Sequence, residues 1–190
     1  METSITKQQL FSKDDLKKLI IPLLFEEALA ITVGMADTVM ISSAGEAAVS
    51  GVTLIDMFNN LIISVLAALA TGGAVVTSQF LGAGKKEDAC KSAKQLIVSS
   101  VCITIGISIL VMVFCNGIIS LFFGKIEADV FHNAVIYMMI SALSFPFLAL
   151  YNSCAALFRS MGNSQITLKV SVVENIINIG GNALGVYVLG

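Results

Sequence analysis

Acidic residues inside long apolar segments are the groups in this sequence that could do chemistry. Asp37 lies 18 residues, or roughly 27 Å of helix, beyond Leu19, where an apolar segment begins. Glu26 lies 11 positions before Asp37, about three helical turns, so the two share a face. An ionised carboxylate at the centre of a lone membrane span costs about 2.5–3.5 kcal/mol and usually faces a protein interior or water-filled cavity. We therefore expect Asp37 to be a functional acid. The alternative is that Asp37 lies near enough to the membrane surface to be hydrated and inert.

A second polar face is predicted on segment 52–76. Asp56, Asn60 and Ser64 follow one another at i+4 spacing, with Asn59 beside them. We interpret Asp56 and Asn60, together with Glu26, as candidate cavity-lining residues. For Asp56 the alternative is an amphipathic helix end exposed to water outside the membrane.

Two asparagines near the end of the chain extend this pattern. Asn178 and Asn182 are four residues apart and face one way, and Asn182 is 16 residues past Ile166, roughly 24 Å along a helix. Its depth therefore approaches that of Asp37. Carboxylate and amide oxygens at matched depth would suit a hard cation such as Na⁺, or a proton. Hydrogen bonding between helices without transport is the alternative for both asparagines.

The composition predicts a membrane protein. Hydrophobic residues make up 56% of the 190 positions and charged residues 13%, unlike an ordinary soluble domain. A membrane-crossing helix needs roughly 20 mostly apolar residues. Segments of this kind lie at about 19–41, 52–76, 95–123, 134–158 and 166–190, the last of them truncated at the end of the sequence. We expect an all-α, polytopic membrane helix bundle with a polar N-terminal segment, 1–18, and a transmembrane lobe, 19–190.

The distribution of lysine and arginine predicts the orientation of the spans. Basic residues precede the first span and follow the second and fourth spans: Lys7, Lys13, Lys17, Lys18, Lys85, Lys86, Lys91, Lys94, Arg159 and Lys169. The opposite side carries only Lys125. Because cytoplasmic loops are enriched in basic residues, we expect a multi-pass protein of the plasma membrane with a cytoplasmic N-terminus.

Other classes of function have little support in the sequence. There is no nucleic-acid motif, no nucleophile motif and no His/Asp/Glu metal cluster, so we expect neither nucleic-acid binding nor an enzyme. Cys90, Cys102, Cys115 and Cys154 form neither a CxxC pair nor a zinc-site spacing. We interpret them as small apolar packing residues and expect no metal other than a possible Na⁺ at Asp37.

Several sequence motifs resemble those of the multidrug and toxic compound extrusion (MATE) family. They are GMADTVMIS in the first span, ATGGAVVTSQFLGAGK closing the second, SFPF in the fourth, and LFRSMGNSQ before the NIINIGGN of the fifth. They occur in the family's order and spacing over nearly the whole chain. The resemblance implies that the chain is the N-terminal lobe of a two-lobed transporter of twelve helices, whose C-terminal lobe lies beyond Gly190.

The resemblance also implies a function and site residues. The function is export of cationic or amphipathic compounds, including drugs, in exchange for inward Na⁺ or H⁺, with no cofactor beyond the coupling ion. Asp37 matches the family's membrane-embedded aspartate of the first span, and Asn178 matches its asparagine of the fifth. Asn182 stands where some members have an aspartate. The expected partners are small organic substrates, membrane lipid and the C-terminal lobe.

Two other functions stay open at this point. One is a flippase for lipid-linked precursors, since related folds move lipids, although such a protein favours a more cationic cavity than these acidic or neutral spans predict. The other is a truncated interaction partner that does not itself transport.

Overall fold

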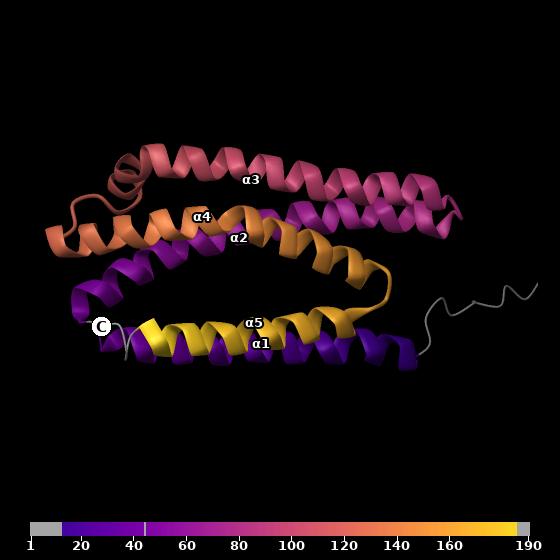
Figure 1. The fold of residues 1–190 in the computed structure, drawn as a ribbon, viewed down its shortest axis with the longest axis horizontal. Coiled ribbons are helices and arrows are strands. Elements are labelled where there is room, and N and C mark those ends of the chain that lie inside the picture. Colours follow the sequence, from indigo (N-terminus) through magenta and orange to yellow (C-terminus); the bar gives the residue numbers. More distant parts are fainter. Residues whose placement is uncertain (1–12, 44, 186–190) are drawn as a thin grey trace, which may run out of the picture.

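The computed structural model describes residues 13–43 and 45–185, which fold into five α-helices (Figure 1). They are α1 (Lys13–Ser42), α2 (Glu46–Gly82), α3 (Lys86–Phe123), α4 (Ala128–Ser160) and α5 (Ser164–Leu184). The predicted all-α bundle is confirmed. Most of the predicted N-terminal segment, 1–18, and the last residues of the predicted fifth span lie outside the described residues.

The first four helices are longer than the apolar segments from which they were predicted. α2 begins at Glu46, six residues before the predicted span, and α3 and α4 also begin before theirs. A hydropathy pattern marks only the part of a helix that lipid surrounds, while its backbone hydrogen bonds continue into the interface. The connecting turns are therefore short. Gly84 and Gly162, which follow α2 and α4, have φ values of 75° and 81°, a conformation that favours glycine.

The five helices form two layers (Figure 1). α1 and α5 lie side by side and run in the same direction, and α2, α3 and α4 form the other layer. The larger core lies within the second layer, where Ile55 of α2, Ile119 of α3 and Phe145 of α4 are almost completely buried. Buried alanines along α4, including Ala134 and Ala142, let the neighbouring helices approach closely.

The outer surface of the bundle is apolar. Large side chains such as Val39, Leu121 and Phe147 are exposed, as expected for helices that face lipid. Among the described residues, α1 to α4 are long and apolar enough to cross a membrane. α5 is not among these four, because Glu174 and a series of asparagines interrupt its apolar residues.

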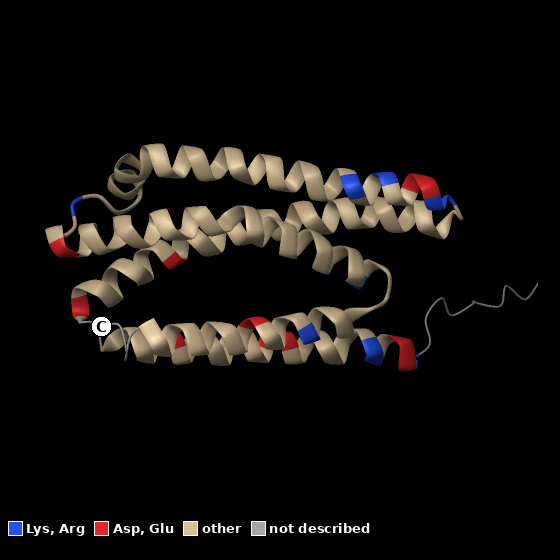
Figure 2. Ribbon diagram, viewed as in Figure 1, with Lys and Arg blue, Asp and Glu red and all other residues tan. Residues whose placement is uncertain are grey.

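The charged residues lie mainly toward the ends of the helices (Figure 2). Basic residues collect at the end that contains the start of α1, the α2–α3 turn and the end of α4. The α3–α4 turn, which contains Lys125, lies at the opposite end (Figure 1). Acidic residues, in contrast, also occur along the helices between the two layers, and these acids mark the candidate site.

Candidate functional site

A cavity of ≈ 660 Å³ lies between the two layers, in the half of the bundle away from the basic end. Side chains from α1, α2, α4 and α5 line it. They include five residues that the sequence had suggested for a site: Asp37, Asp56, Asn60, Asn178 and Asn182. Glu26, the sixth, does not line this cavity.

Asp37 is half-buried in the wall of the cavity and contacts α5. The Asn182 amide donates a hydrogen bond from Nδ2 to Asp37 Oδ1 at 2.8 Å. The same Nδ2 lies 3.2 Å from Asn178 Oδ1, one helical turn earlier. The parallel packing of α1 and α5 explains this contact, because it places residues at the same depth in the two spans side by side.

Asn178 is a second amide partner of Asp37. Its side-chain amide fits the neighbouring groups best with the nitrogen toward α1, where it donates to the Asp37 carboxylate, at 3.1 Å from Oδ1 and 3.2 Å from Oδ2. Both asparagines of α5 then donate to the carboxylate of α1.

A second carboxylate faces the cavity from α2. Asp56 Oδ1 accepts a hydrogen bond from the Tyr137 hydroxyl of α4 at 2.9 Å. Nearby, Asn59 donates to Ser141 Oγ at 3.1 Å. Tyr137 was not identified from the sequence as a hydrogen-bond partner of Asp56. A signal was present, because Tyr137 and Tyr151 are 14 residues apart, about four turns, and therefore share one face of α4.

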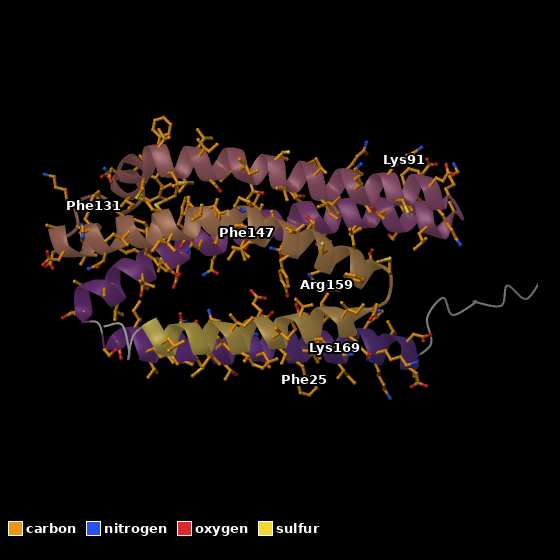
Figure 3. The ribbon with its side chains drawn as sticks, in the orientation of Figure 1. Phe25, Lys91, Phe131, Phe147, Arg159 and Lys169 are labelled. Atoms are coloured by element: carbon orange, nitrogen blue, oxygen red, sulfur yellow. The ribbon has the colours of Figure 1, made fainter. Side chains whose placement is uncertain are left out.

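Glu26 lies about 16 Å along α1 from Asp37, toward the basic end of the bundle. Its side chain is 15% exposed, and its Oε1 accepts a hydrogen bond from the Tyr151 hydroxyl at 3.2 Å. The Arg159 guanidinium lies 3.8 Å from the same oxygen. Figure 3 shows Arg159 between the two layers, on the side of α4 that faces α1 and α5. Phe25, which precedes Glu26 in α1, lies on the outer side of the α1–α5 layer.

The cavity is suited to positive charge. Among the described residues, its lining contains two carboxylates, several amide and hydroxyl oxygens, and no lysine or arginine. Among the residues that the structure describes, no group of three His, Cys, Asp or Glu side chains could hold a metal ion in the manner of a zinc or calcium site. A cation in the cavity would meet the carboxylates of Asp37 and Asp56 and neutral amide and hydroxyl oxygens.

Known proteins resemble this chain in sequence. The uncharacterized transporter YisQ of Bacillus subtilis is 31% identical over 191 residues, which cover 95% of this chain and 42% of YisQ. The probable multidrug resistance protein NorM of Thermotoga maritima is 25% identical over 172 residues, which cover 88% of this chain and 36% of NorM. The chain thus spans about two fifths of the length of these relatives.

Solved structures share the fold. A MOP superfamily transporter from Pyrococcus furiosus superimposes with a TM-score of 0.85 at 21% identity, over 94% of this chain and 39% of the other. An outward-facing MATE family transporter of the same superfamily gives the same TM-score at 20% identity, with the same coverage. These likenesses establish the arrangement of helices, which is that of part of a multi-pass membrane transporter. The MatE family model matches residues 22–184, most of the chain, and the chain therefore belongs to the MatE family of transporters.

Proposed function

We propose that the complete protein is an antiporter that exports cationic or amphipathic compounds, including drugs, in exchange for inward Na⁺ or H⁺. The observation that carries this proposal is the contact between Asp37 and Asn182 in the wall of an acidic cavity. Asp37 is the coupling acid, and Asn178 and Asn182 are its amide partners. The similarity to NorM of Thermotoga maritima, a probable multidrug resistance protein, supports the same class of function.

The geometry suggests how coupling works. With no cation bound, the Asp37 carboxylate is stabilised by amide donors from α5. A bound Na⁺ or proton neutralises the carboxylate, so these donors are no longer needed and the amides can turn their oxygens toward the cation. The α1–α5 contact thereby changes with the state of the site. Inward movement of one charge across 100 mV supplies about 2.3 kcal/mol for this exchange.

The orientation is part of the proposal. The basic end of the bundle faces the cytoplasm, which places the N-terminus inside and the cavity in the outer half of the membrane. A coupling cation therefore enters the cavity from outside and leaves toward the basic end. The cavity also accepts the exported compound, whose positive charge matches the carboxylates Asp37 and Asp56.

Replacing Asp37 by asparagine in the complete protein tests the proposal. Asp37→Asn keeps the shape of the side chain and removes its charge, so we expect ion-gradient-driven efflux of ethidium from proteoliposomes to be abolished. Insertion into the membrane and the amount of purified protein should stay unchanged. The control is Asp129→Asn, an exposed aspartate in the first turn of α4, which should transport normally. Normal gradient-driven efflux by the Asp37→Asn protein, at matched protein amount, would show that the coupling site lies elsewhere.

A further inference from the structure

A second polar cluster lies between the layers, on the basic side of the cavity. Its centre is Glu26 of α1, which contacts Tyr151 and Arg159 of α4. Glu174 of α5 belongs to it as well, because it lies one helical turn before Asn178 on the face of α5 that meets α1 at Asp37. The cluster therefore joins α1, α4 and α5 at a level about three helical turns from Asp37. A cation that passes from the cavity toward the basic end meets this cluster next.

The charges of this cluster do not balance. They include two carboxylates, Glu26 and Glu174, and one guanidinium, Arg159, which contacts Glu26, so one negative charge is left over among these groups. One oxygen of Glu26 is satisfied by Tyr151 and Arg159, whereas Oε2 is shielded from solvent and has no hydrogen-bond partner among the described residues. An uncompensated carboxylate within a membrane is costly, and a single proton or monovalent cation would neutralise it.

A row of oxygens connects this cluster with Asp37. On α5, Glu174, Asn178 and Asn182 follow one another at i+4 spacing and so share one face. The last two contact or approach Asp37, and the first lies one helical turn before Asn178. The seam between α1 and α5 thus carries carboxylate and amide oxygens from the level of Asp37 to the level of Glu26.

We propose that Glu26, with Glu174 and Arg159, forms a second cation site at which the inward-moving ion stops after leaving Asp37. This inference rests on the proposed function, since it assigns the next site on the path of the same ion. The ligand is a single positive charge without a large organic group, either a proton or Na⁺. The ion binds at Glu26 Oε2, the oxygen without a hydrogen-bond partner among the described residues, while Arg159 shifts but stays beside the cluster, so that two positive charges balance the two carboxylates.

The separation between Arg159 and Glu26 fits this role. At 3.8 Å, their nitrogen and oxygen are farther apart than the roughly 2.7–2.9 Å of a tight charge-assisted hydrogen bond. The Arg159 side chain is 35% exposed, which leaves room for the guanidinium to shift. Tyr151 and Arg159 of α4 contact Glu26, Glu174 lies on the same face of α5 as Asn178 and Asn182, and Glu27 of α1 is one residue away and exposed.

Labelling of carboxyl groups with dicyclohexylcarbodiimide tests the site in the complete protein, without a transport assay. This apolar reagent modifies protonated carboxyls inside membranes, and mass spectrometry assigns the modified residue. We expect Glu26 to react increasingly as the pH falls. If the site takes Na⁺, labelling at fixed pH falls about tenfold at a Na⁺ concentration ten times Kd, compared with choline at equal ionic strength. If it takes only protons, Na⁺ and choline give equal labelling.

The controls separate this site from general exposure. Glu27 lies in the same peptide and should show no protection by Na⁺, and Glu26→Gln removes the labelled position. In Arg159→Gln, the competing charge is gone, so half-maximal protection should need an at least about tenfold lower Na⁺ concentration, or labelling should begin at a higher pH in the proton case. Absence of Glu26 labelling over the whole pH range would overturn the proposal, and so would an Arg159→Gln protein that labels like the original.

The same experiment keeps the two proposals apart. Asp37 is monitored in its own peptide, and Asp37→Asn protein is labelled in parallel. If Glu26 is labelled as expected but Asp37→Asn transports normally, the coupling role of Asp37 is wrong and the Glu26 site stands. If Asp37 is required for coupled efflux but Glu26 does not react, the proposed function stands and the second site is wrong.

Discussion

The close approach of α2 and α4 at Gly51 gives a sharp prediction for protein stability. A Cβ atom added at Gly51 would lie 3.0 Å from the backbone nitrogen of Ala134 and 3.0 Å from the carbonyl oxygen of Val130. Ordinary contacts between such atoms are about 3.5–4.0 Å. Because both obstacles are backbone atoms of α4, no side-chain rotation relieves the clash, and the two helices must move apart.

The size of the effect follows from two opposing contributions. Overpacking of a well-packed interior costs about 1–3 kcal/mol. Alanine is better than glycine within a helix by about 1 kcal/mol, which offsets part of this cost. We therefore expect Gly51→Ala to lower the free energy of unfolding by up to about 2 kcal/mol. For a chain of this size, each kcal/mol lowers Tm by about 2–4 °C.

Gly72→Ala is the matched control, because Gly72 lies in the same helix and a Cβ there would meet no atom within 4 Å. Gly72→Ala has the higher helix propensity of alanine but brings no new atom close to another helix, so the Tm of this variant should stay unchanged or rise. The measurement is the amount of monodisperse protein that remains after heating, followed by size-exclusion chromatography in detergent. If the Gly51→Ala and Gly72→Ala proteins have equal Tm values, the close contact between α2 and α4 is not present as described.

Three further predictions concern topology, packing and the extent of the functional unit. In a variant without the native cysteines, a cysteine at Ser43 should react with a membrane-impermeant maleimide in intact cells, and one at Lys86 only after permeabilisation; labelling of position 86 from outside would reverse the topology. Phe145→Ala should lower Tm, because it opens a cavity at a residue that is 1% exposed, and such losses of stability reach about 3–5 kcal/mol in soluble cores. The control Phe147→Ala, at a residue that is 72% exposed, should change Tm little. Equal Tm shifts in the two variants would contradict the assigned core. Residues 1–190 alone should not transport ethidium in proteoliposomes, because alternating access needs two units that move around a central site, and efflux by the purified fragment would refute this.

The pattern of apolar segments was sufficient to predict the helices and their order. Asp37 and Asn182 could also be assigned to a similar depth in the membrane, because depth along a span follows from counting residues. The structure brings Asp37 and Asn182 into contact as this matched depth suggests. The predicted ends of the helices were less accurate, since polar residues such as those after Glu46 continue a helix beyond the apolar part.

The lateral arrangement of the helices could not be derived from the sequence. Periodicity tells which residues share a face, but it does not tell which helix that face meets. The hydrogen bond from Tyr137 to Asp56 and the contact of Glu26 with Arg159 both depend on where α4 lies relative to α1 and α2. This is also why Glu26 and Asp37, on one face of α1, belong to different clusters: α5 amides meet Asp37, and α4 side chains meet Glu26.

The parallel pairing of α1 with α5 has a consequence for how the protein is made. The 121 residues from 43 to 163 separate the two helices in the chain. At a synthesis rate of about 5–20 residues per second, α5 follows α1 out of the ribosome by about 6–24 s. During this interval α2, α3 and α4 can already associate through their own core, while α1 waits in the membrane with Asp37 lacking its amide partner from α5. Because α1 packs mainly against α5, the helix with the candidate coupling acid completes its contacts only after the last of the described helices has been made.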